Sequence, residues 1–387
     1  MPERLTLRSL NRALMARQGL LSRWELPVPD VVESVGALQA QHWPSVRVAL
    51  WSRTARVRLD DIHEAFERRR LVAGTLLRRT LHVVTARQHP VYAVVAREGG
   101  DDDSRRTSTG PSADGLESLR EEVLVHAGAV PRSRVELVAF IEDWIARHPP
   151  VLAEPEIARQ RQYQWRPLLT SSAFVRVAAD GDWSGSRTPD DRLAARSVHA
   201  AHLDGGRPPA TEEALGALVR WHLGAFGPAG ADDVAAWIGW RTGPVREAVD
   251  RLGDELGRFQ DEAGRTLYDL PGAPRPDPDV PAPPRLLPGF DSALLAYAAA
   301  RRARIVPPSS RERIYVRANL QVLPTFLVDG MVAGTWSTKA GSREATLSLR
   351  PFERLGRASR DGLVDEAERL LRFSQPAASV HRVEFDG

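Results

Sequence analysis

Two glutamines, Gln39 and Gln41, stand two residues apart in the segment GALQAQHW, just before Pro44. Neither side chain is an acid or a base at neutral pH. An amide can orient a water through its carbonyl oxygen, donate to a phosphate or a base edge, or place its dipole beside a developing positive charge. As catalytic groups, the two amides therefore suit a reaction whose leaving group departs readily.

The direction in which these amides point depends on the element that carries them. The apolar spacing of residues 29–41 predicts a helix, on which residues two apart project about 200° from one another. Pro44 keeps Trp43 out of the helical region, so we expect the helix to end between residues 39 and 43. A turn there would aim both amides into one cavity. The alternative, in which Gln39 caps a backbone carbonyl and Gln41 faces solvent, stays open from these residues alone.

A second candidate site is the segment LLRRTLHVV, residues 76–84, which has the composition of a strand. A period of two places Arg78, Thr80 and His82 on one face of that strand and Arg79 on the other. The first face is suited to binding a phosphate or positioning a substrate. An ordinary half-buried strand with a hydrogen-bonded histidine is the alternative.

Arginine supplies nearly all of the positive charge, because Lys339 is the only lysine among 53 basic residues. The net charge is +3, but residues 1–90 hold 15 Arg against 8 Asp and Glu, and such segregation favours a polyanionic partner. Spaced arginines near expected hairpins suit contact with a nucleic-acid backbone, and a solvated surface is the alternative. They are residues 68–70, Arg301, Arg302, Arg304, Arg311, Arg313 and Arg317.

Composition excludes several kinds of chemistry. The absence of cysteine removes disulfides, thiolate nucleophiles and Cys-ligated metal sites, and no two histidines have HExxH spacing, so we expect no metal. No glycine-rich phosphate loop is present, and a Schiff base would need Lys339 or the amino terminus, so we expect no cofactor. No apolar run reaches the length of a membrane span and no signal-peptide core is present, so we expect a cytoplasmic protein with no membrane partner.

The predicted elements repeat in a recognisable order. A Ser-x-x-Glu capping box at Ser133 opens a helix, a second short helix covers residues 161–172, and a hairpin is expected to turn at Asp180-Gly181. Residues 211–270 then predict three helices followed by a hairpin around Ala263-Gly264. Helix, helix, helix, hairpin is the order of elements in a winged helix. Helical segments near residues 5–19, 29–41 and 59–69, followed by strand-like residues 71–86, fit a similar unit less cleanly.

We therefore expect a mainly α protein with β structure, built from tandem winged-helix motifs and a C-terminal β-barrel-like domain. Seven prolines in fourteen residues predict an extended connector, and the strands beyond it turn at Asp329-Gly330 before a final helix. The expected divisions are residues 1–110, 111–205 and 206–270 for the three winged-helix units, 271–284 for the connector and 285–387 for the C-terminal domain.

Seven stretches in order along the chain resemble the winged-helix DNA glycosylases of the AlkZ and YcaQ type. They are LNRALMARQGLL, VVESVGALQAQ, ALWSR, LLRRTLHVVTA, GAFGPAGADDVAAWIGW, RLLPGFDSALLAY and VLPTFLVDGMVAGTW. The signature of that family is Gln-apolar-Gln or Gln-apolar-Asp, and Gln39-Ala40-Gln41 is similar to the AlkZ-like branch. The sequence departs from the family at Arg79, where a glycine is common, and at residues 299–301, where an Asp-Arg pair is usual.

The resemblance implies a monofunctional DNA glycosylase that cuts the N-glycosidic bond of cationic N7-alkylated purines. Bulky adducts and interstrand crosslinks are expected substrates, in DNA repair or in self-resistance to alkylating natural products. It implies that Gln39 and Gln41 are catalytic, and that the DNA-binding residues include Arg78, Arg79, Thr80, His82, Arg301 and Arg302. Double-stranded DNA is the expected partner of a monomer that associates with the nucleoid. The alternatives are a non-catalytic winged-helix DNA-binding regulator and a toxin-sequestering protein.

Overall fold

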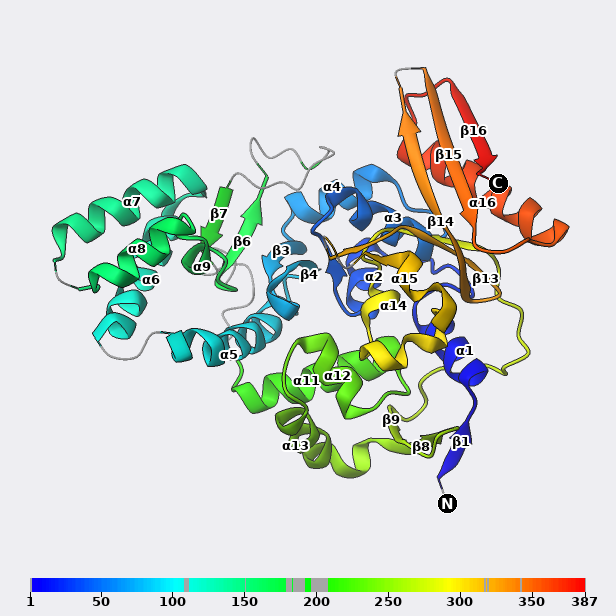
Figure 1. The fold of residues 1–387 in the computed structure, drawn as a ribbon, viewed down its shortest axis with the longest axis horizontal. Coiled ribbons are helices and arrows are strands. Elements are labelled where there is room, and N and C mark those ends of the chain that lie inside the picture. Colours follow the sequence, from blue (N-terminus) through cyan, green and yellow to red (C-terminus); the bar gives the residue numbers. More distant parts are fainter. Residues whose placement is uncertain are drawn as a thin grey trace. The chain divides into compact units, whose positions relative to one another are not determined.

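Helices and strands are mixed along the whole chain in the computed structural model, as the sequence predicts (Figure 1). The structure describes residues 2–107, 111–149, 151–178, 183, 192–195, 208–316, 318, 320–341 and 343–386. The chain divides into two units, and the first is discontinuous: residues 1–62 with 216–387, against residues 63–215. The crossings between units lie inside helices α4 (Leu59–Glu67) and α11 (Thr211–Phe226).

The first unit begins with the segment that carries the two glutamines. Thr6 caps helix α1 because its side-chain oxygen accepts the Ser9 N–H at 3.1 Å. The elements of this part of the chain are short, and the apolar side of each faces the core. In order they are strand β1 (Glu3–Leu5), helices α1 (Leu7–Arg17) and α2 (Val28–Ser34), strand β2 (Leu38–Gln39) and helix α3 (Trp43–Arg53).

The predicted order of three helices and a hairpin is confirmed between residues 211 and 269. The elements after α11 are α12 (Ala231–Ile238), α13 (Thr242–Leu252), the 3-10 turn η3 (Gly253–Glu255), β8 (Gly257–Asp261) and β9 (Thr266–Asp269). Strands β8 and β9 are antiparallel, and β1 adds to β8 in parallel. Ala229, between the first two helices, pairs with Tyr268 of β9.

A five-stranded sheet forms the C-terminal part of the first unit, in the order β10-β13-β14-β15-β16. Its strands are β10 (Arg285–Leu287), β13 (Thr325–Val328), β14 (Met331–Ala340), β15 (Glu344–Pro351) and β16 (Val380–Phe385). Asp329 and Gly330 make the predicted turn between β13 and β14, both at positive φ. Among the residues described, β10 and β16 are edges, so the predicted barrel is an open sheet.

One face of this sheet is covered by helices α16 (Arg357–Ser374) and α3. The shared core combines Trp336 and Leu349 of the sheet with Leu370 of α16 and Trp51 of α3. Helix α16 connects β15 to β16, and these two strands are parallel. The sheet therefore supports α3, the helix that begins directly after the two glutamines.

Residues 271–284, all of which the structure describes, contain no helix or strand. Arginines of α1 donate to backbone carbonyls along this connector: Arg8 to Pro278 and Arg12 to Val280, both at 2.7 Å, and Arg17 to Pro274 at 3.0 Å. Short elements follow it before the sheet. They are α14 (Ser292–Leu295), η4 (Ala299–Arg304), η5 (Pro308–Ser310), α15 (Arg311–Ile314), β11 (Tyr315–Val316) and β12 (Gln321–Val322).

The second unit contains a small sheet and a group of helices with its own core. Its strands pair in the order β4-β3-β6-β7-β5, antiparallel throughout. Ser133 and Glu136 form the predicted capping box at the start of α7. The predicted turn at residues 180–181 lies outside the residues described, and the strand that pairs with β6 comes later, at residues 192–195. Helices α6, α7 and α8 lie together (Figure 1). Their core includes Leu119, Ile141 and Trp165.

The bounds of the elements in the second unit are as follows. The strands are β3 (Leu71–Thr75), β4 (Leu81–Thr85), β5 (Arg132–Ser133), β6 (Phe174–Val177) and β7 (Arg192–Ala195). The helices are η1 (Leu77–Arg79), α5 (His89–Thr107), α6 (Pro111–Ala129), α7 (Arg134–Arg147), α8 (Glu154–Gln162) and α9 (Arg166–Leu169).

Candidate active site

Gln39 lies on a strand and not at the end of a helix, so the predicted helix over residues 29–41 is wrong beyond Ser34. Burial alternates from Leu38 to Gln41: Leu38 is 1% exposed, Gln39 is half-buried, Ala40 is fully buried and Gln41 is exposed. A period of two places residues two apart on the same side of an extended chain. Strand β2 ends at Gln39, and the alternation of burial continues as far as Gln41, which favours a common side for the two amides.

The helix stops early because the backbone turns sharply at Gly36 and Ala37. Their φ values are +75° and +79°, in the left-handed region that costs a residue with a Cβ about 1–2 kcal/mol. A Cβ on Gly36 would meet the Phe226 ring at 3.0 Å, so this position requires glycine. Ala37 is held by the buried Ser292 hydroxyl, which donates to its carbonyl at 2.7 Å. Tertiary contacts thus fix the turn that precedes Gln39.

Pro44 begins a helix, which corrects its predicted role as a helix terminator. It lies in the first turn of α3, where the missing N–H costs nothing because such groups have no partner within the helix. At the other end of α3, Arg53 makes a bidentate ion pair with Asp291, at 2.8 and 2.9 Å, and both side chains are fully buried. Arg53 also donates to Gln18 Oε1 at 3.0 Å.

The Oε1 atom of Gln39 is buried and accepts no hydrogen bond from the residues that the structure describes. Leaving a buried amide oxygen without a donor costs about 1–3 kcal/mol, and most such groups in folded proteins are paired. This orphan oxygen therefore fits a group that receives its partner from a bound water or substrate. The alternative, in which Gln39 caps a backbone carbonyl, would use the amide nitrogen and is not tested by this oxygen, and Gln41 is exposed as that alternative expects.

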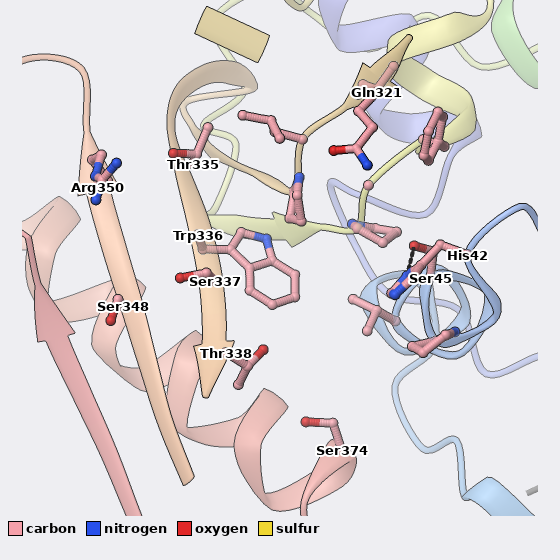
Figure 2. Close-up of a pocket in the computed structure, with 18 of the residues that line it drawn as sticks. His42, Ser45, Gln321, Thr335, Trp336, Ser337, Thr338, Ser348, Arg350 and Ser374 are labelled. Carbon is pink, nitrogen blue, oxygen red and sulfur yellow. Dashed lines mark hydrogen bonds between the residues drawn. The ribbon is translucent and has the colours of Figure 1, made fainter. Parts of the chain in front are cut away.

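A cavity of about 590 Å³ begins at His42, the residue next to Gln41. Figure 2 shows His42 and Ser45 at the start of α3 on one side and Trp336 and Thr338 of β14 on the facing side. The His42 Nδ1 and the Ser45 hydroxyl are 3.0 Å apart and hydrogen-bonded. Partial burial lowers the pKa of His42 below its ordinary value of 6.5, which favours the neutral imidazole at neutral pH.

Arg78, Thr80 and His82 do not share one strand face, so that prediction is wrong. Arg78 and Arg79 form a 3-10 turn between β3 and β4 with φ of +52° and +56°, and the Thr80 hydroxyl donates to the Leu77 carbonyl at 3.0 Å. Only His82 lies on the strand β4. The alternation fails because the hairpin needs these residues for its turn.

His82 is a neutral histidine that supports this turn. Its side chain is 2% exposed, and its Nδ1–H donates to the Thr80 carbonyl at 2.8 Å. Burial, helped by the charge of Arg78, lowers the pKa of His82 to about 3. The predicted contact of His82 with a phosphate is therefore corrected, because a buried neutral imidazole offers no charge.

The left-handed turn gives a physical reason for the glycine that related sequences commonly carry at Arg79. Glycine adopts positive φ without a steric cost. Arg79 keeps that conformation, and its side chain is exposed. Arg79 is therefore the residue of this turn best placed to meet an anion in solution.

The predicted arginine cluster near residue 300 divides into one accessible and two packed side chains. Arg301 is 40% exposed and lies 3.8 Å from Asp232. Arg302 lies over the Tyr315 ring and donates to the Tyr297 carbonyl at 3.2 Å. Arg304 is 1% exposed and donates to the Pro228 carbonyl at 2.9 Å, so its predicted surface role is wrong. Arg304 also lies over the Tyr297 ring, with its guanidinium carbon 4.0 Å from the ring centroid.

The remaining arginines named from the sequence are dispersed. Arg313 donates to the Phe352 carbonyl at 3.3 Å, and Arg317 lies outside the residues described. Within the described ranges, no group of three or more His, Asp and Glu side chains is arranged to hold a metal ion. Over the same ranges, none of the helices combines the length and apolar character needed to cross a membrane.

Sequence reasoning missed the residues that hold the glutamine strand in place. Asp291 caps α14 by accepting the Ala293 N–H at 3.0 Å while it binds Arg53, and Ser292 binds the Ala37 carbonyl. An Asp-Ser pair before the apolar run ALLAY is a helix-start signal, which the pattern of residues contained. The residues that this pair contacts, Arg53 and Ala37, lie more than 230 residues earlier in the chain, and no sequence signal marked them as partners.

Comparisons with known proteins relate the chain to DNA glycosylases. The family model described as DNA glycosylase AlkZ-like matches residues 32–373. The chain is 25% identical over 371 residues to the interstrand DNA cross-link repair glycosylase of Streptomyces sahachiroi, covering 93% of this chain and 94% of that protein. The solved structure of the Streptomyces sahachiroi DNA glycosylase AlkZ has a TM-score of 0.80 and 21% identity, over 99% of this chain and 100% of that one. The family match includes Gln39 and Gln41.

Proposed function

The chain belongs to the AlkZ-like DNA glycosylase family and is a DNA glycosylase, and on that premise we propose that it removes cationic N7-alkylated purines from duplex DNA. Bulky adducts are included, and interstrand crosslinks joined through such a purine are released by the same cut. The role is DNA repair or self-resistance to an alkylating natural product. The single observation that carries the proposal is the buried Oε1 of Gln39, which accepts no hydrogen bond from the described residues and lies two residues before Gln41.

The reaction suits amides because an N7-alkylated purine already carries positive charge. When the C1′–N9 bond breaks, its electrons go to the purine, which leaves as a neutral base without prior protonation. The sugar becomes oxocarbenium-like, and a water adds at C1′ and gives a proton to solvent. Two preorganised amide dipoles can stabilise that cation and orient the water. A neutral lesion would need a stronger acid, so we expect selectivity for cationic adducts.

The two glutamines take different parts in this proposal. Gln41 is exposed and orients the attacking water, and Gln39 places its orphan oxygen beside the positive sugar. A Schiff base would need Lys339 or the amino terminus, so we propose a monofunctional enzyme that leaves an abasic site. No cofactor takes part in this chemistry.

DNA binding is assigned to arginines and to winged-helix elements. Arg79, on the exposed turn, and Arg301 contact phosphates, with Arg78, Thr80 and Arg302 beside them. Residues 206–270 form a winged helix, supported by the helix order and by the pairing of Ala229 with Tyr268. We extend this reading to residues 1–110 and 111–205, with 271–284 as connector and 285–387 as C-terminal domain. The protein acts as a cytoplasmic monomer on the nucleoid.

The test is single-turnover release of 7-methylguanine from methylated duplex DNA. Gln39→Ala and Gln41→Ala are each expected to lower the rate constant by at least about 100-fold, as for loss of one preorganised electrostatic group. Gln162→Ala, at an exposed position at the end of α8, is the matched control and should release base like the wild type. Wild-type rates in both motif variants would overturn the assignment.

A further inference from the structure

Gln18, the C-cap residue of helix α1, is a neutral polar side chain that is completely buried in the first unit. Its exposed fraction is 0%. Glutamine is mostly found at protein surfaces, and a buried amide needs hydrogen-bond partners for both its oxygen and its nitrogen. The reason for burying an amide at this position therefore lies in the groups that it binds.

The amide of Gln18 connects three segments that are distant in sequence. Its Nε2 donates to the Ala225 carbonyl at 2.9 Å and, more weakly, to the Val35 carbonyl at 3.5 Å. Its Oε1 accepts a hydrogen bond from Arg53 at 3.0 Å. Both ends of the amide are thus used, and they connect α1 to the C-terminal ends of α2, α3 and α11.

Two of these contacts lie directly at the turn that precedes Gln39. Val35 is the residue before Gly36, and Gly36 packs against the end of α11. A Cβ on Gly36 would meet the Phe226 ring at 3.0 Å and the Ala225 methyl at 3.2 Å. The Gln18 amide therefore holds the carbonyl that enters the turn and the helix end against which the turn packs.

Arg53 extends the same set of contacts to the other side of the turn. Its guanidinium binds Gln18 and makes the bidentate ion pair with Asp291 at 2.8 and 2.9 Å. Ser292, next to Asp291, donates to the Ala37 carbonyl at 2.7 Å. The carbonyls before and after the glycine of the turn are therefore held by one connected set of buried side chains.

We propose that Gln18 is a positioning residue for base release and that it acts through Gln39. The inference rests on the proposed function, in which the Gln39 Oε1 stabilises the positive sugar. Gln18→Met keeps the length of the side chain but removes its hydrogen bonds, while Arg53 retains its ion pair with Asp291. The turn then shifts and moves Gln39. Because a displacement of about 1 Å can cost about 100-fold in rate, we expect a smaller shift to cost about tenfold.

The test is a double-mutant cycle on the single-turnover release of 7-methylguanine from methylated duplex DNA. Gln18→Met should lower the rate constant about tenfold in the wild-type background and less than about twofold in the Gln39→Ala background. The second loss is small because Gln18 then has no catalytic amide left to position. A general weakening of the fold would lower both rate constants by the same factor. The dissociation constant for DNA, from fluorescence anisotropy, should stay at the wild-type value.

Gln160→Met is the matched control for the loss of a buried amide. Gln160 is 3% exposed, and its Nε2 donates to Glu156 at 2.8 Å in the unit of residues 63–215. Its substitution should leave the rate constant unchanged in both backgrounds. Urea unfolding reports whether Gln18→Met is folded. If it is not, Gln18→Glu, which keeps an oxygen acceptor for Arg53 and loses the N–H donors, replaces it with the same expected factors.

The outcomes separate this inference from the proposed function. A wild-type rate in the Gln18 variant, or the same fractional loss in both backgrounds, overturns the positioning role alone. A wild-type rate in Gln39→Ala overturns the catalytic role of that glutamine and the inference with it.

Discussion

Removing the Ser292 hydroxyl tests whether the turn before Gln39 is held by tertiary contacts. Ala37 is 2% exposed, and its carbonyl accepts a 2.7 Å hydrogen bond from Ser292 that Ser292→Ala removes. An unsatisfied buried carbonyl costs about 1–3 kcal/mol. If Ala37 leaves its left-handed conformation, about 1–2 kcal/mol of strain is released. The free energy of unfolding should therefore fall by only about 1 kcal/mol, because the turn relaxes.

Catalysis should suffer more than stability, because the relaxed turn moves Gln39. A displacement of about 1 Å at a reacting group can cost about 100-fold in rate. We expect single-turnover release of 7-methylguanine to fall between about tenfold and 100-fold, with the dissociation constant for DNA unchanged. Rates come from quenched single-turnover reactions, stability from urea unfolding and affinity from fluorescence anisotropy.

Ser172→Ala is the matched control for this variant. Ser172 and Ser292 are each 8% exposed, and the Ser172 hydroxyl donates to the buried Ala93 carbonyl at 2.8 Å. Ser172 belongs to the other unit, residues 63–215. It should lose about 1–3 kcal/mol of stability and keep the wild-type rate constant. The reasoning is refuted if Ser292→Ala releases base at the wild-type rate while it loses as much stability as Ser172→Ala.

Three further predictions concern buried and exposed charges. Asp291→Ala leaves the buried Arg53 without its carboxylate and should lower the free energy of unfolding in urea by about 3–5 kcal/mol. Asp60→Ala, at the exposed pair with Arg58, should lower it by at most about 1 kcal/mol, and equal losses in the two variants would contradict this reasoning. His82 has a folded pKa of about 3 against 6.5, so the unfolded chain binds more protons and stability falls as pH falls from 6.5 toward 3. His82→Gln should lower the slope of the free energy of unfolding against pH by about 1.4 kcal/mol per pH unit in this range. Equal slopes for the variant and the wild type would contradict the buried neutral histidine. Arg79→Ala should weaken binding to undamaged duplex and lower the log-log salt slope by about 0.9; an unchanged slope argues against a phosphate contact.

Local sequence signals predicted the elements whose geometry is set by neighbouring residues. The capping box at Ser133 starts α7, and Asp329-Gly330 turns between β13 and β14, because each device is complete within a few residues. The hairpin around Gly264 was predicted for the same reason. These successes depend on side chains and backbone groups that are close in the chain.

The errors fall where distant residues decide the backbone. Ala37, Arg78 and Arg79 adopt positive φ, which their residue types disfavour, so periodicity extended a helix through Gln39 and a strand through Arg78. The partners that impose the turn at Ala37 include Ser292, which lies 255 residues away. The predicted barrel failed similarly, because β16 joins the sheet in parallel through α16 and leaves it open.

The spacing of the glutamines follows from the strand that carries them. On an extended chain, side chains alternate between the two sides, so Ala40 points away from the side of Gln39 and Gln41. Ala40 is fully buried. A polar residue at that position would enter the core without a partner, so an apolar residue is required between the amides. The Gln-apolar-Gln pattern is thus the sequence form of a short extended segment that buries its middle residue. A helix would have required a spacing of three or four for the same result.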